Sequence, residues 1–140
     1  MSRKPESVFI ARVHQYLPQK VHREAMGTGF SNGIPDRYYE GIANSLWTEY
    51  KYLSTIPPLI NLMNPKAQVK LSPLQQKWLL RATSNGQNTS VIVGCKTGGV
   101  ILTNLEWVNP IPRADFLARI KTRKEIAAWI ARITIGLAEV

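Results

Sequence analysis

Three side chains in the first half of the chain are suited to metal-assisted hydrolysis: Asp36, Glu49 and Lys51. Magnesium prefers oxygen ligands and usually keeps several waters, so one or two carboxylates and a substrate oxygen are enough to hold it. A metal ion held in this way polarises a phosphoryl group and lowers the pKa of a bound water. A nearby lysine can orient that water or offset the negative charge that develops on the substrate. Together, these residue types suit the hydrolysis of a phosphate ester.

These side chains need two paired strands to bring them together. Two β-prone runs, 34–39 and 46–53, are separated by a segment with turn residues at both ends, and they predict a hairpin. Pairing in a hairpin can place Asp36 and Glu49 within a few ångströms of each other. Glu49 and Lys51 are two residues apart, so their side chains project from the same face of one strand. The alternative is a solvent-exposed salt bridge, because many strands contain alternating charges.

The segment before Asp36 is suited to placing a ligand. Pro35 restricts the residue before it to an extended conformation, and Gly33 permits a close approach of the backbone, so the chain that enters Asp36 is stiff. Further upstream, the pattern predicts a helix at 5–17 that is stopped by Pro18, a short strand at 21–26 and a glycine-rich loop at 27–33.

Capping patterns predict where two later helices begin. Ser72-Pro73-Leu74-Gln75 is a capping-box pattern that opens a helix through about Ser84, with Asn85-Gly86 closing it. Thr122, with Glu125 three residues later, repeats the pattern near the end of the chain. The other predicted elements are an irregular excursion at 54–71, a strand at 89–95, a turn at Gly98-Gly99, a strand at 100–103, and helices at about 113–121 and 123–138.

This order of elements predicts an α/β protein with one central mixed β-sheet flanked by helices and with extra C-terminal helices. At 140 residues, a single domain spanning 1–140 is expected. The C-terminal extension, about 113–138, combines apolar stripes with basic side chains that could form a solvated face, contact DNA or support a dimer. The basic residues are Arg113, Arg119, Lys121, Arg123, Lys124 and Arg132.

Composition favours an anionic partner without identifying it. Lys and Arg number 18 against 9 Asp and Glu, which gives a net charge of +9. Such a surface attracts nucleic acid, although membranes and acidic proteins also bind basic proteins. The single cysteine, Cys95, excludes an internal disulfide and a cysteine-based zinc cluster. With no long apolar run and no leader pattern, we expect no membrane span and a cytoplasmic location, in a bacterial or phage-infected cell.

The order and spacing of these motifs resemble a known family. Gly33-x-Pro35-Asp36, then Glu49-x-Lys51, then Ser72-x-x-Gln75-x-x-Trp78-Leu79, and Gly86 before the strand Val91-Ile92-Val93, resemble the PD-(D/E)XK nuclease superfamily. Within it the likeness is to the VRR-NUC type, including small stand-alone phage and bacterial members. The resemblance covers about residues 5–103.

That resemblance implies a restriction-endonuclease-like αβββαβ core, Mg²⁺ as cofactor with Mn²⁺ able to substitute, DNA as partner and a homodimer. It makes Asp36 and Glu49 the metal ligands, the backbone carbonyl of Tyr50 a further ligand, and Lys51 the catalytic lysine. Gln75 matches the glutamine of the next helix, a role compatible with its capping box. Many members also use a glutamate on the first helix, which here is Glu6, and Glu24 is a competing fourth carboxylate.

Three functions remain open on the sequence. The first is a metal-dependent endonuclease that cuts DNA, in particular at junctions, flaps or nicks, since stand-alone relatives include dimeric junction resolvases. The second is a non-catalytic nucleic-acid-binding protein that retains the fold. The third is a regulatory protein of phage origin that binds a host factor through the apolar segment 56–63.

Other reactive or aromatic residues receive structural interpretations. His14 and His22 lack a third ligand at zinc spacing and are expected at the surface, while Cys95 is expected to be a buried thiol. Trp47 shares a strand face with Glu49 and could border the site. The tryptophans expected in the core are Trp78, Trp107 and Trp129.

Overall fold

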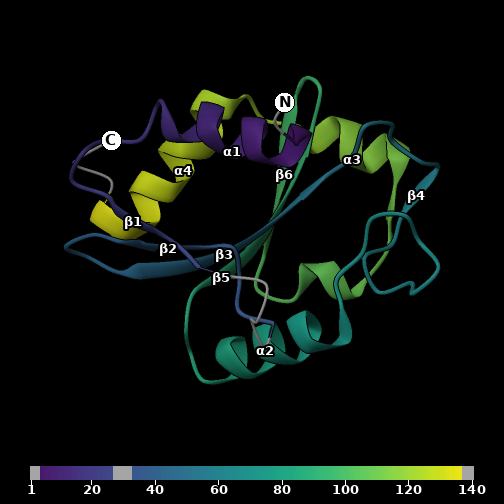
Figure 1. Ribbon diagram of the computed structural model, residues 1–140, viewed down its shortest axis with the longest axis horizontal. Coiled ribbons are helices and arrows are strands. Elements are labelled where there is room, and N and C mark those ends of the chain that lie inside the picture. The colour runs from purple at the N-terminus through teal and green to yellow at the C-terminus, as the bar shows by residue number, and fades with distance from the viewer. Residues whose placement is uncertain (1–3, 27–32, 137–140) are drawn as a thin grey trace.

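A five-stranded mixed β-sheet runs through the computed structural model, which describes residues 4–26 and 33–136 (Figure 1). In spatial order its strands are β1 (His22–Ala25), β2 (Arg37–Glu40), β3 (Ser45–Tyr52), β5 (Thr89–Cys95) and β6 (Gly98–Thr103). β3 and β5 are parallel, whereas the other neighbouring pairs are antiparallel. A parallel pair requires a crossover connection, which here contains α2 (Pro73–Ser84).

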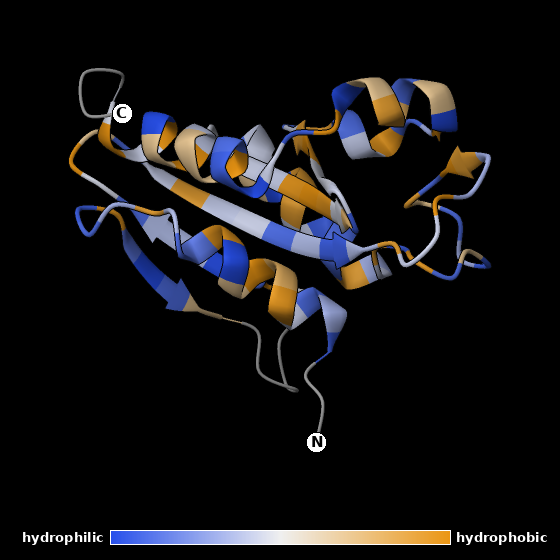
Figure 2. Cartoon of the chain, turned by 90° about the horizontal axis from the view of Figure 1, so that it is seen from above, coloured by the Kyte–Doolittle hydropathy of each residue, from blue (hydrophilic) through white to orange (hydrophobic). Residues whose placement is uncertain are grey.

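Helices cover both faces of this sheet. α1 (Pro5–His14) and α4 (Arg123–Ile135) lie together on one face, α2 lies on the other, and α3 (Arg113–Arg119) packs near β6 (Figure 1). Hydrophilic and hydrophobic bands alternate along the helices in Figure 2, as expected for helices that bury one side. The predicted α/β class, with its αβββαβ order and extra C-terminal helices, is confirmed. None of the helices in the described residues is long and apolar enough to cross a membrane.

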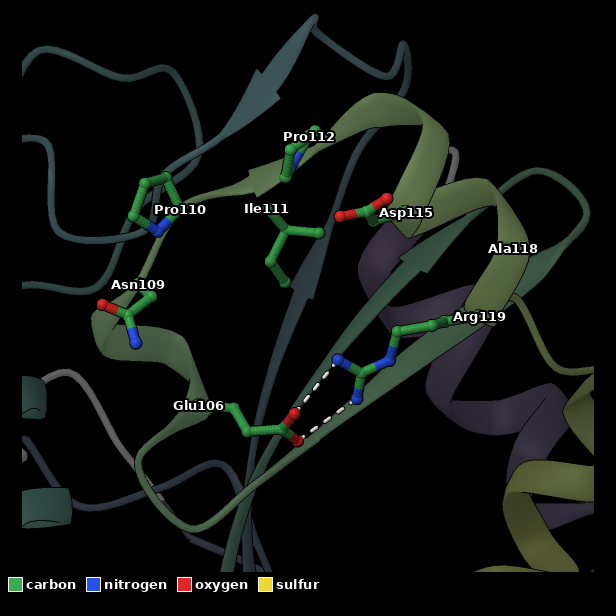
Figure 3. Close-up of a pocket in the computed structure, with 8 residues that line it drawn as sticks. All are labelled: Glu106, Asn109, Pro110, Ile111, Pro112, Asp115, Ala118 and Arg119. Atoms are coloured by element: carbon green, nitrogen blue, oxygen red, sulfur yellow. Dashed lines mark hydrogen bonds and ion pairs between the residues drawn. The ribbon is translucent and has the colours of Figure 1, made fainter.

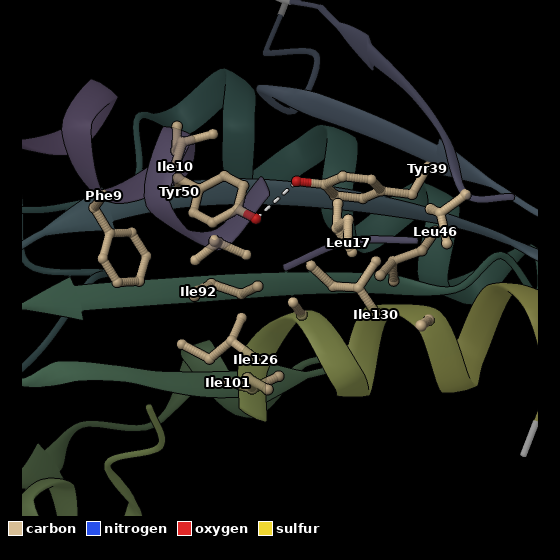
Figure 4. Packing of buried hydrophobic residues seen from close by; sticks show 14 of the residues in the cluster. Phe9, Ile10, Leu17, Tyr39, Leu46, Tyr50, Ile92, Ile101, Ile126 and Ile130 are labelled. Atoms are coloured by element: carbon tan, nitrogen blue, oxygen red, sulfur yellow. Dashed lines mark hydrogen bonds between the residues drawn. The ribbon is translucent and has the colours of Figure 1, made fainter. Parts of the chain in front are cut away.

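β5 separates two hydrophobic clusters, because successive side chains of a strand point to opposite faces. Ile92 belongs to the cluster beneath α1 and α4, part of which Figure 4 shows. Val91 and Val93 belong to the cluster on the side of α2, and every residue of β5 is buried. This packing on both sides holds β5 in place, and with it β3, whose Glu49 and Lys51 pair in register with Val91 and Val93.

The predicted hairpin around the site is present as the antiparallel pair β2 and β3. β2 begins at Arg37, later than the predicted start at residue 34, because Pro35 has no N–H to donate to a ladder. Both predicted capping boxes are also present, at the starts of α2 and α4. β1 lies within the predicted 21–26 strand, while 27–32 of the glycine-rich loop lies outside the described residues.

α1 ends at His14, before the predicted end of the helix at residue 17. The N–H groups of Tyr16 and Leu17 bond to the carbonyls of Val13 and His14, three residues back, rather than four. This tighter turn directs Leu17 into the core, where it is buried. The spacing of apolar residues therefore predicts which side chains are buried, but it does not predict the tighter turn in which the α-helix ends.

The predicted Gly98-Gly99 turn is wrong. Both glycines lie in β6, and the turn falls at Lys96 and Thr97. A Cβ atom at Gly98 would lie 2.1 Å from the carbonyl oxygen of Lys121, and Gly99 and Lys121 exchange two backbone hydrogen bonds. Glycine is required here by the close approach of two chain segments, which sequence spacing does not reveal.

The 54–71 segment is less irregular than predicted. It contains β4 (Leu59–Ile60), which pairs with β7 (Ile111–Pro112) in a second, two-stranded sheet. Arg113 adds two bonds to this segment, from its N–H to the carbonyl of Pro58 at 3.0 Å and from Nε to the carbonyl of Ile56 at 3.0 Å. Strands of two residues leave no periodic signal, so this pairing could not be predicted.

An open cavity of about 500 Å³ lies between α3 and the 3-10 helix η1 (Glu106–Val108) (Figure 3). Arg119 Nη1 and Glu106 Oε2 form an ion pair across it at 3.0 Å, and Arg119 also donates to the carbonyl of Ile101 at 2.8 Å. The carboxylate of Glu106 accepts a further bond from the N–H of Thr103 at 2.8 Å. These contacts fasten α3 to β6, and none of the predicted site residues lines this cavity.

Candidate active site

Asp36 and Glu49 are joined through backbone N–H groups. Asp36 Oδ2 accepts a hydrogen bond from the N–H of Tyr50 at 2.9 Å, and Glu49 Oε1 accepts one from the N–H of Asp36 at 3.2 Å. Asp36 directly precedes β2 and Glu49 lies in β3, so the pairing of the hairpin brings the two acids together. Glu49 is only 2% exposed, whereas Asp36 is half-buried.

Gln75 joins Lys51 to Glu49 at the start of α2. Its Nε2 donates to Glu49 Oε2 at 2.9 Å, and its Oε1 accepts from Lys51 Nζ at 3.2 Å. The same Oε1 accepts from the N–H of Ser72 at 2.9 Å, which is one half of the capping box. One side chain therefore both caps α2 and contacts the two side chains of β3. Lys51 Nζ also lies 3.4 Å from Glu49 Oε2.

Gly33 brings the segment before Asp36 against the same helix end. Its φ of +84° lies in the left-handed region, and a Cβ atom there would be 2.3 Å from the carbonyl oxygen of Leu74 and 2.7 Å from the N of Gln75. Only glycine fits this conformation and this contact. The close approach expected from the sequence is therefore an approach to α2, which fixes Asp36 relative to Gln75.

The edge of β3 beside Asp36 also carries the carbonyl of Tyr50. The register of β2 with β3 runs only from Ser45 to Thr48, so Tyr50 lies beyond the paired part of that edge. In a strand, the N–H and C=O of one residue point to the same neighbour. Because the N–H of Tyr50 bonds to Asp36, its carbonyl also faces the side of Asp36.

Burial governs the protonation of Glu49. Burial, with the negative charge of Asp36 as a second cause, raises the pKa of Glu49 to about 8, although the ammonium of Lys51 opposes the rise. A cation shared by the two carboxylates would remove the cost of their proximity. The site therefore holds a carboxyl group whose charge stays unfavourable even with the ammonium of Lys51 3.4 Å away.

Glu6 lies at the rim of this group. With Lys51, Gln75, Lys70 and other residues, it lines an open cavity of about 440 Å³. Burial and then the charge of Asp36 raise the pKa of Glu6, while Lys51 lowers it. Glu6 is thus near enough to respond to both site residues. Lys70, at the end of the 54–71 segment, also lines this cavity, and no motif in the sequence predicts that position.

A buried chain of hydrogen bonds behind the site was missed in the sequence. Tyr39 and Tyr50 bond through their hydroxyl groups at 2.7 Å, and His14 Nε2 bonds to the Tyr39 hydroxyl at 2.7 Å (Figure 4 shows the tyrosine pair). His14 is half-buried rather than on the surface as predicted, because α1 packs it against Tyr39. Burial lowers the pKa of His14 to about 4. The chain fixes the ring of Tyr50, whose backbone holds Asp36.

The remaining candidates lie around or away from this group. Glu24 is exposed and pairs with His22 at 3.0 Å, so the structure does not bring it to Asp36. Trp47 packs between the rings of Tyr38 and Trp78, with centroids 4.6 and 5.0 Å away, two residues before Glu49. The expected burial is confirmed for Cys95 and Trp107, whereas Trp78 and Trp129, expected in the core, are partly buried and pack against it.

The donor set suits a hard divalent cation. Within 4–26 and 33–136, no three His, Cys, Asp or Glu side chains gather, so the group offers two carboxylates and a carbonyl rather than a zinc cluster. Magnesium binds one or two carboxylates and completes its shell with waters and substrate oxygens. The carboxylates of Asp36 and Glu49 and the carbonyl of Tyr50 all come from one edge of β3 and the segment beside it. These residues fit such an ion.

Comparisons with known proteins give a likeness in structure alone. No family model and no curated protein matches the sequence. Among solved structures, the chain is similar to Hjc, a Holliday junction resolvase from the archaeal hyperthermophile Archaeoglobus fulgidus, with a TM-score of 0.56 and 14% sequence identity. The match covers 89% of this chain and 97% of the resolvase. At this identity the likeness establishes a shared fold, and it agrees with the nuclease architecture expected from the motifs.

Proposed function

We propose that this chain is a divalent-metal-dependent nuclease that hydrolyses phosphodiester bonds in DNA. We place it in the PD-(D/E)XK superfamily, in its VRR-NUC type, on the motifs at Asp36, Glu49-x-Lys51 and Gln75. The observation that carries the proposal is the single cluster formed by these four residues: Gln75 bonds to the side chains of Glu49 and Lys51, and the N–H of Asp36 bonds to Glu49, at 2.9 to 3.2 Å. A fold shared with a Holliday junction resolvase supports it.

In this proposal Asp36, Glu49 and the carbonyl of Tyr50 hold Mg²⁺, and Mn²⁺ can replace it. The bound ion would polarise the phosphoryl group and supply a nucleophilic water at neutral pH. Lys51 acts from the same face of β3, where its ammonium orients the attacking water or offsets the charge on the phosphate. Gln75 holds the ammonium in place through Oε1.

Glu6 and Lys70 have positions suited to substrate contact in this proposal. Both line the cavity that Lys51 and Gln75 also line, so a phosphate in it would meet the ammonium groups of Lys51 and Lys70. Glu6 is on the same cavity wall and could bind a water or take part in holding a second ion. Hydrolysis there adds water across one P–O bond and leaves a phosphomonoester and a free hydroxyl.

For the substrate, we propose branched or interrupted DNA, such as a junction, flap or nick, cut by a homodimer. Two-fold symmetry presents one site to each of two strands, which suits a junction. The neighbour in structure is itself a Holliday junction resolvase. Sedimentation of the free protein would measure whether two copies associate.

The test is cleavage of supercoiled plasmid and of synthetic four-way, flap, nicked and single-stranded DNA, with Mg²⁺, Mn²⁺ or EDTA. We expect cutting with either metal and none in EDTA. If the wild-type protein cuts none of these substrates with either metal, the proposal is wrong. The chain would then be at most a DNA-binding protein without catalytic activity.

Variants of site residues, each paired with a variant of an exposed residue of the same charge, separate the effect of the site on cleavage from the effect of overall charge. Glu49→Ala and Lys51→Ala should abolish cutting while DNA binding is largely retained. Their matched controls are Glu24→Ala, an exposed acid on β1, and Lys77→Ala, an exposed base on α2, neither of which contacts the cluster. Cutting that is unchanged in Glu49→Ala and Lys51→Ala would refute the assignment of the site.

A further inference from the structure

A second cavity adjoins the candidate active site. It has a volume of about 480 Å³ and is formed by the end of β3 and the segment around β4. Tyr52, Gln68 and Val69 line both this cavity and the one that contains Lys51 and Lys70. A substrate bound at Lys51 would therefore have this second cavity directly beside it.

The two cavities differ in charge. The cavity at the candidate site includes Lys51, Lys70 and Glu6, whereas the second cavity contains no Lys, Arg, Asp, Glu or His among its lining residues. Its polar side chains are neutral amides and hydroxyls, and the others are aliphatic or aromatic. A phosphate would find no counter-charge there, so the second cavity suits an uncharged polar group.

Several of these polar groups are free to bind a ligand. The side chains of Ser54, Thr55 and Gln68 make no hydrogen bond to other residues in the described part of the chain. By contrast, Oδ1 of Asn61 and of Asn64 cap local turns, through bonds of 3.1 and 3.0 Å to the N–H groups of Met63 and Lys66. These two bonds hold the wall of the cavity in shape. The free groups both donate and accept hydrogen bonds.

A nucleobase has the matching properties. It is neutral and planar, its edge presents donors and acceptors together, and its face stacks on aromatic side chains. Tyr52 lines both cavities, and its ring packs on that of Phe9 with centroids 6.2 Å apart. We propose that the second cavity binds one unpaired nucleobase of the substrate, next to the phosphate held at Lys51 and Lys70.

This inference rests on the proposed nuclease function for the place of the phosphate, and it narrows the substrate class. A base in a duplex is stacked and paired, so it cannot enter a cavity without leaving the helix. A flap, a displaced strand or a frayed branch point supplies an unpaired base without that cost. The chain should therefore act at branch points that offer an unpaired nucleotide and should act poorly on uninterrupted duplex.

The first test measures binding without cleavage. Wild-type protein in EDTA is titrated with a single-stranded trinucleotide that carries 2-aminopurine at its centre, and with the same trinucleotide carrying an abasic residue there. We expect fluorescence quenching as the base stacks, and binding that is roughly tenfold weaker for the abasic probe, because an abasic residue has no base to stack. Equal affinity for the two probes overturns the inference, whether or not the chain cleaves DNA.

Variants of residues that line the second cavity test whether the base binds there. Ala67→Phe fills the second cavity and should remove the preference for the base-bearing probe, while Thr55→Val removes one hydroxyl without changing the volume and should reduce the preference severalfold. The matched control is Ala118→Phe, which places the same side chain in the cavity beside α3 (Figure 3) and should keep the full preference. Thermal unfolding of each variant shows whether it is folded.

Cleavage then separates the two proposals. If wild-type protein cuts branched DNA but Ala67→Phe and Thr55→Val keep the full preference for a base, the nuclease proposal stands and the base cavity is wrong. If no DNA is cut but the base preference is present and is lost in Ala67→Phe, the cavity binds a base and the nuclease proposal fails.

Discussion

Gln75 makes three side-chain contacts that belong to two roles, the cap of α2 and the bridge between Lys51 and Glu49. Its Oε1 accepts bonds from the N–H of Ser72 and from Lys51, and its Nε2 donates to Glu49. A helix cap is usually replaceable at a modest cost in stability. Here the cap is also the group that orients the ammonium of Lys51, so its loss should affect stability and catalysis together.

We expect Gln75→Ala and Ser72→Ala to separate these effects. Both remove a half of the capping box and should destabilise the fold by about 1 kcal/mol in chemical denaturation. Ser72→Ala keeps the bond from its N–H to Gln75, so cleavage should change little, whereas Gln75→Ala should slow it about 100-fold by misplacing Lys51. A similar loss of cleavage in both variants would mean that the cap alone matters.

Glu49 gives the metal-free protein a dependence of stability on pH. Its pKa in the folded state is about 8, against a usual value of 4.5, so the folded state binds more protons than the unfolded state between these values. The contribution of Glu49 to the free energy of unfolding is therefore greatest below pH 4.5 and is lost as the pH rises to about 8. His14 acts in the opposite direction, since its pKa falls from 6.5 to about 4.

Glu49→Gln should remove the Glu49 contribution and leave that of His14. The free energy of unfolding in EDTA, measured at intervals from pH 4.5 to 8, should decrease with rising pH in wild type relative to Glu49→Gln, which keeps the increase that His14 contributes below pH 6.5. The loss of the contact from Glu49 Oε2 to Gln75 shifts the variant curve by a constant and leaves its slope unchanged. Parallel curves would contradict the raised pKa. Added Mg²⁺ should stabilise the wild type at pH 8 and not the variant.

At the scale of elements, the site depends on how α2 meets the segment before β2. Gly33 lies against the backbone of Leu74 and Gln75, so the segment that carries Asp36 is in direct contact with the helix that carries Gln75. Gly86, at the other end of α2, has nearly the same φ, +86° against +84°, but a Cβ atom there would meet nothing within 4 Å. The chain thus provides two glycines with nearly the same φ and different packing.

Gly86→Ala and Gly33→Ala should therefore have different effects on stability and on cleavage. Alanine at Gly86 should lower the free energy of unfolding by about 1–2 kcal/mol, the cost of a left-handed backbone for a residue with a Cβ atom. Cleavage should be unaffected. Alanine at Gly33 adds a collision with Leu74, so it should destabilise the fold further and slow cleavage by displacing Asp36. Denaturation and cleavage rates measure both effects. Equal losses at the two positions would show that packing against α2 has no role.

The elements also show what the sequence can and cannot predict. Local signals were sufficient for the two capping boxes, the β2–β3 hairpin and the shared face of Glu49 and Lys51, because each depends on a few neighbouring residues. The pairing of β4 with β7, the packing of Gly98 on Lys121 and the burial of His14 join segments far apart in the chain. The spacing of apolar residues along the chain does not predict such long-range contacts.

At the scale of the whole molecule, a cavity with basic side chains lies on the face of the sheet opposite α2 (Figure 1). A cavity of about 280 Å³ between α1 and α4 is lined by Arg12, Arg123, Lys124 and neutral residues, with no acid among them. Arg123 donates to the carbonyl of Lys96 at 3.3 Å and lies over the ring of Phe9, while its buried Nε has no partner in the described part of the chain. A second DNA segment bound here would meet these basic side chains away from Lys51.

The salt dependence of DNA binding tests this surface with two exposed bases of one helix. Lys124 lines the cavity in the first turn of α4, and Arg132 lies in its last turn, outside the cavity. Each phosphate contact contributes about 0.9 to the slope of log affinity against log salt, so Lys124→Gln should reduce the slope by about one and Arg132→Gln should leave it unchanged. Neither change reaches the cluster at Glu49, so the cleavage rate at saturating DNA and low salt should stay that of wild type. Equal slope changes in both variants would mean that DNA responds to net charge, and the surface between α1 and α4 would then have no particular role.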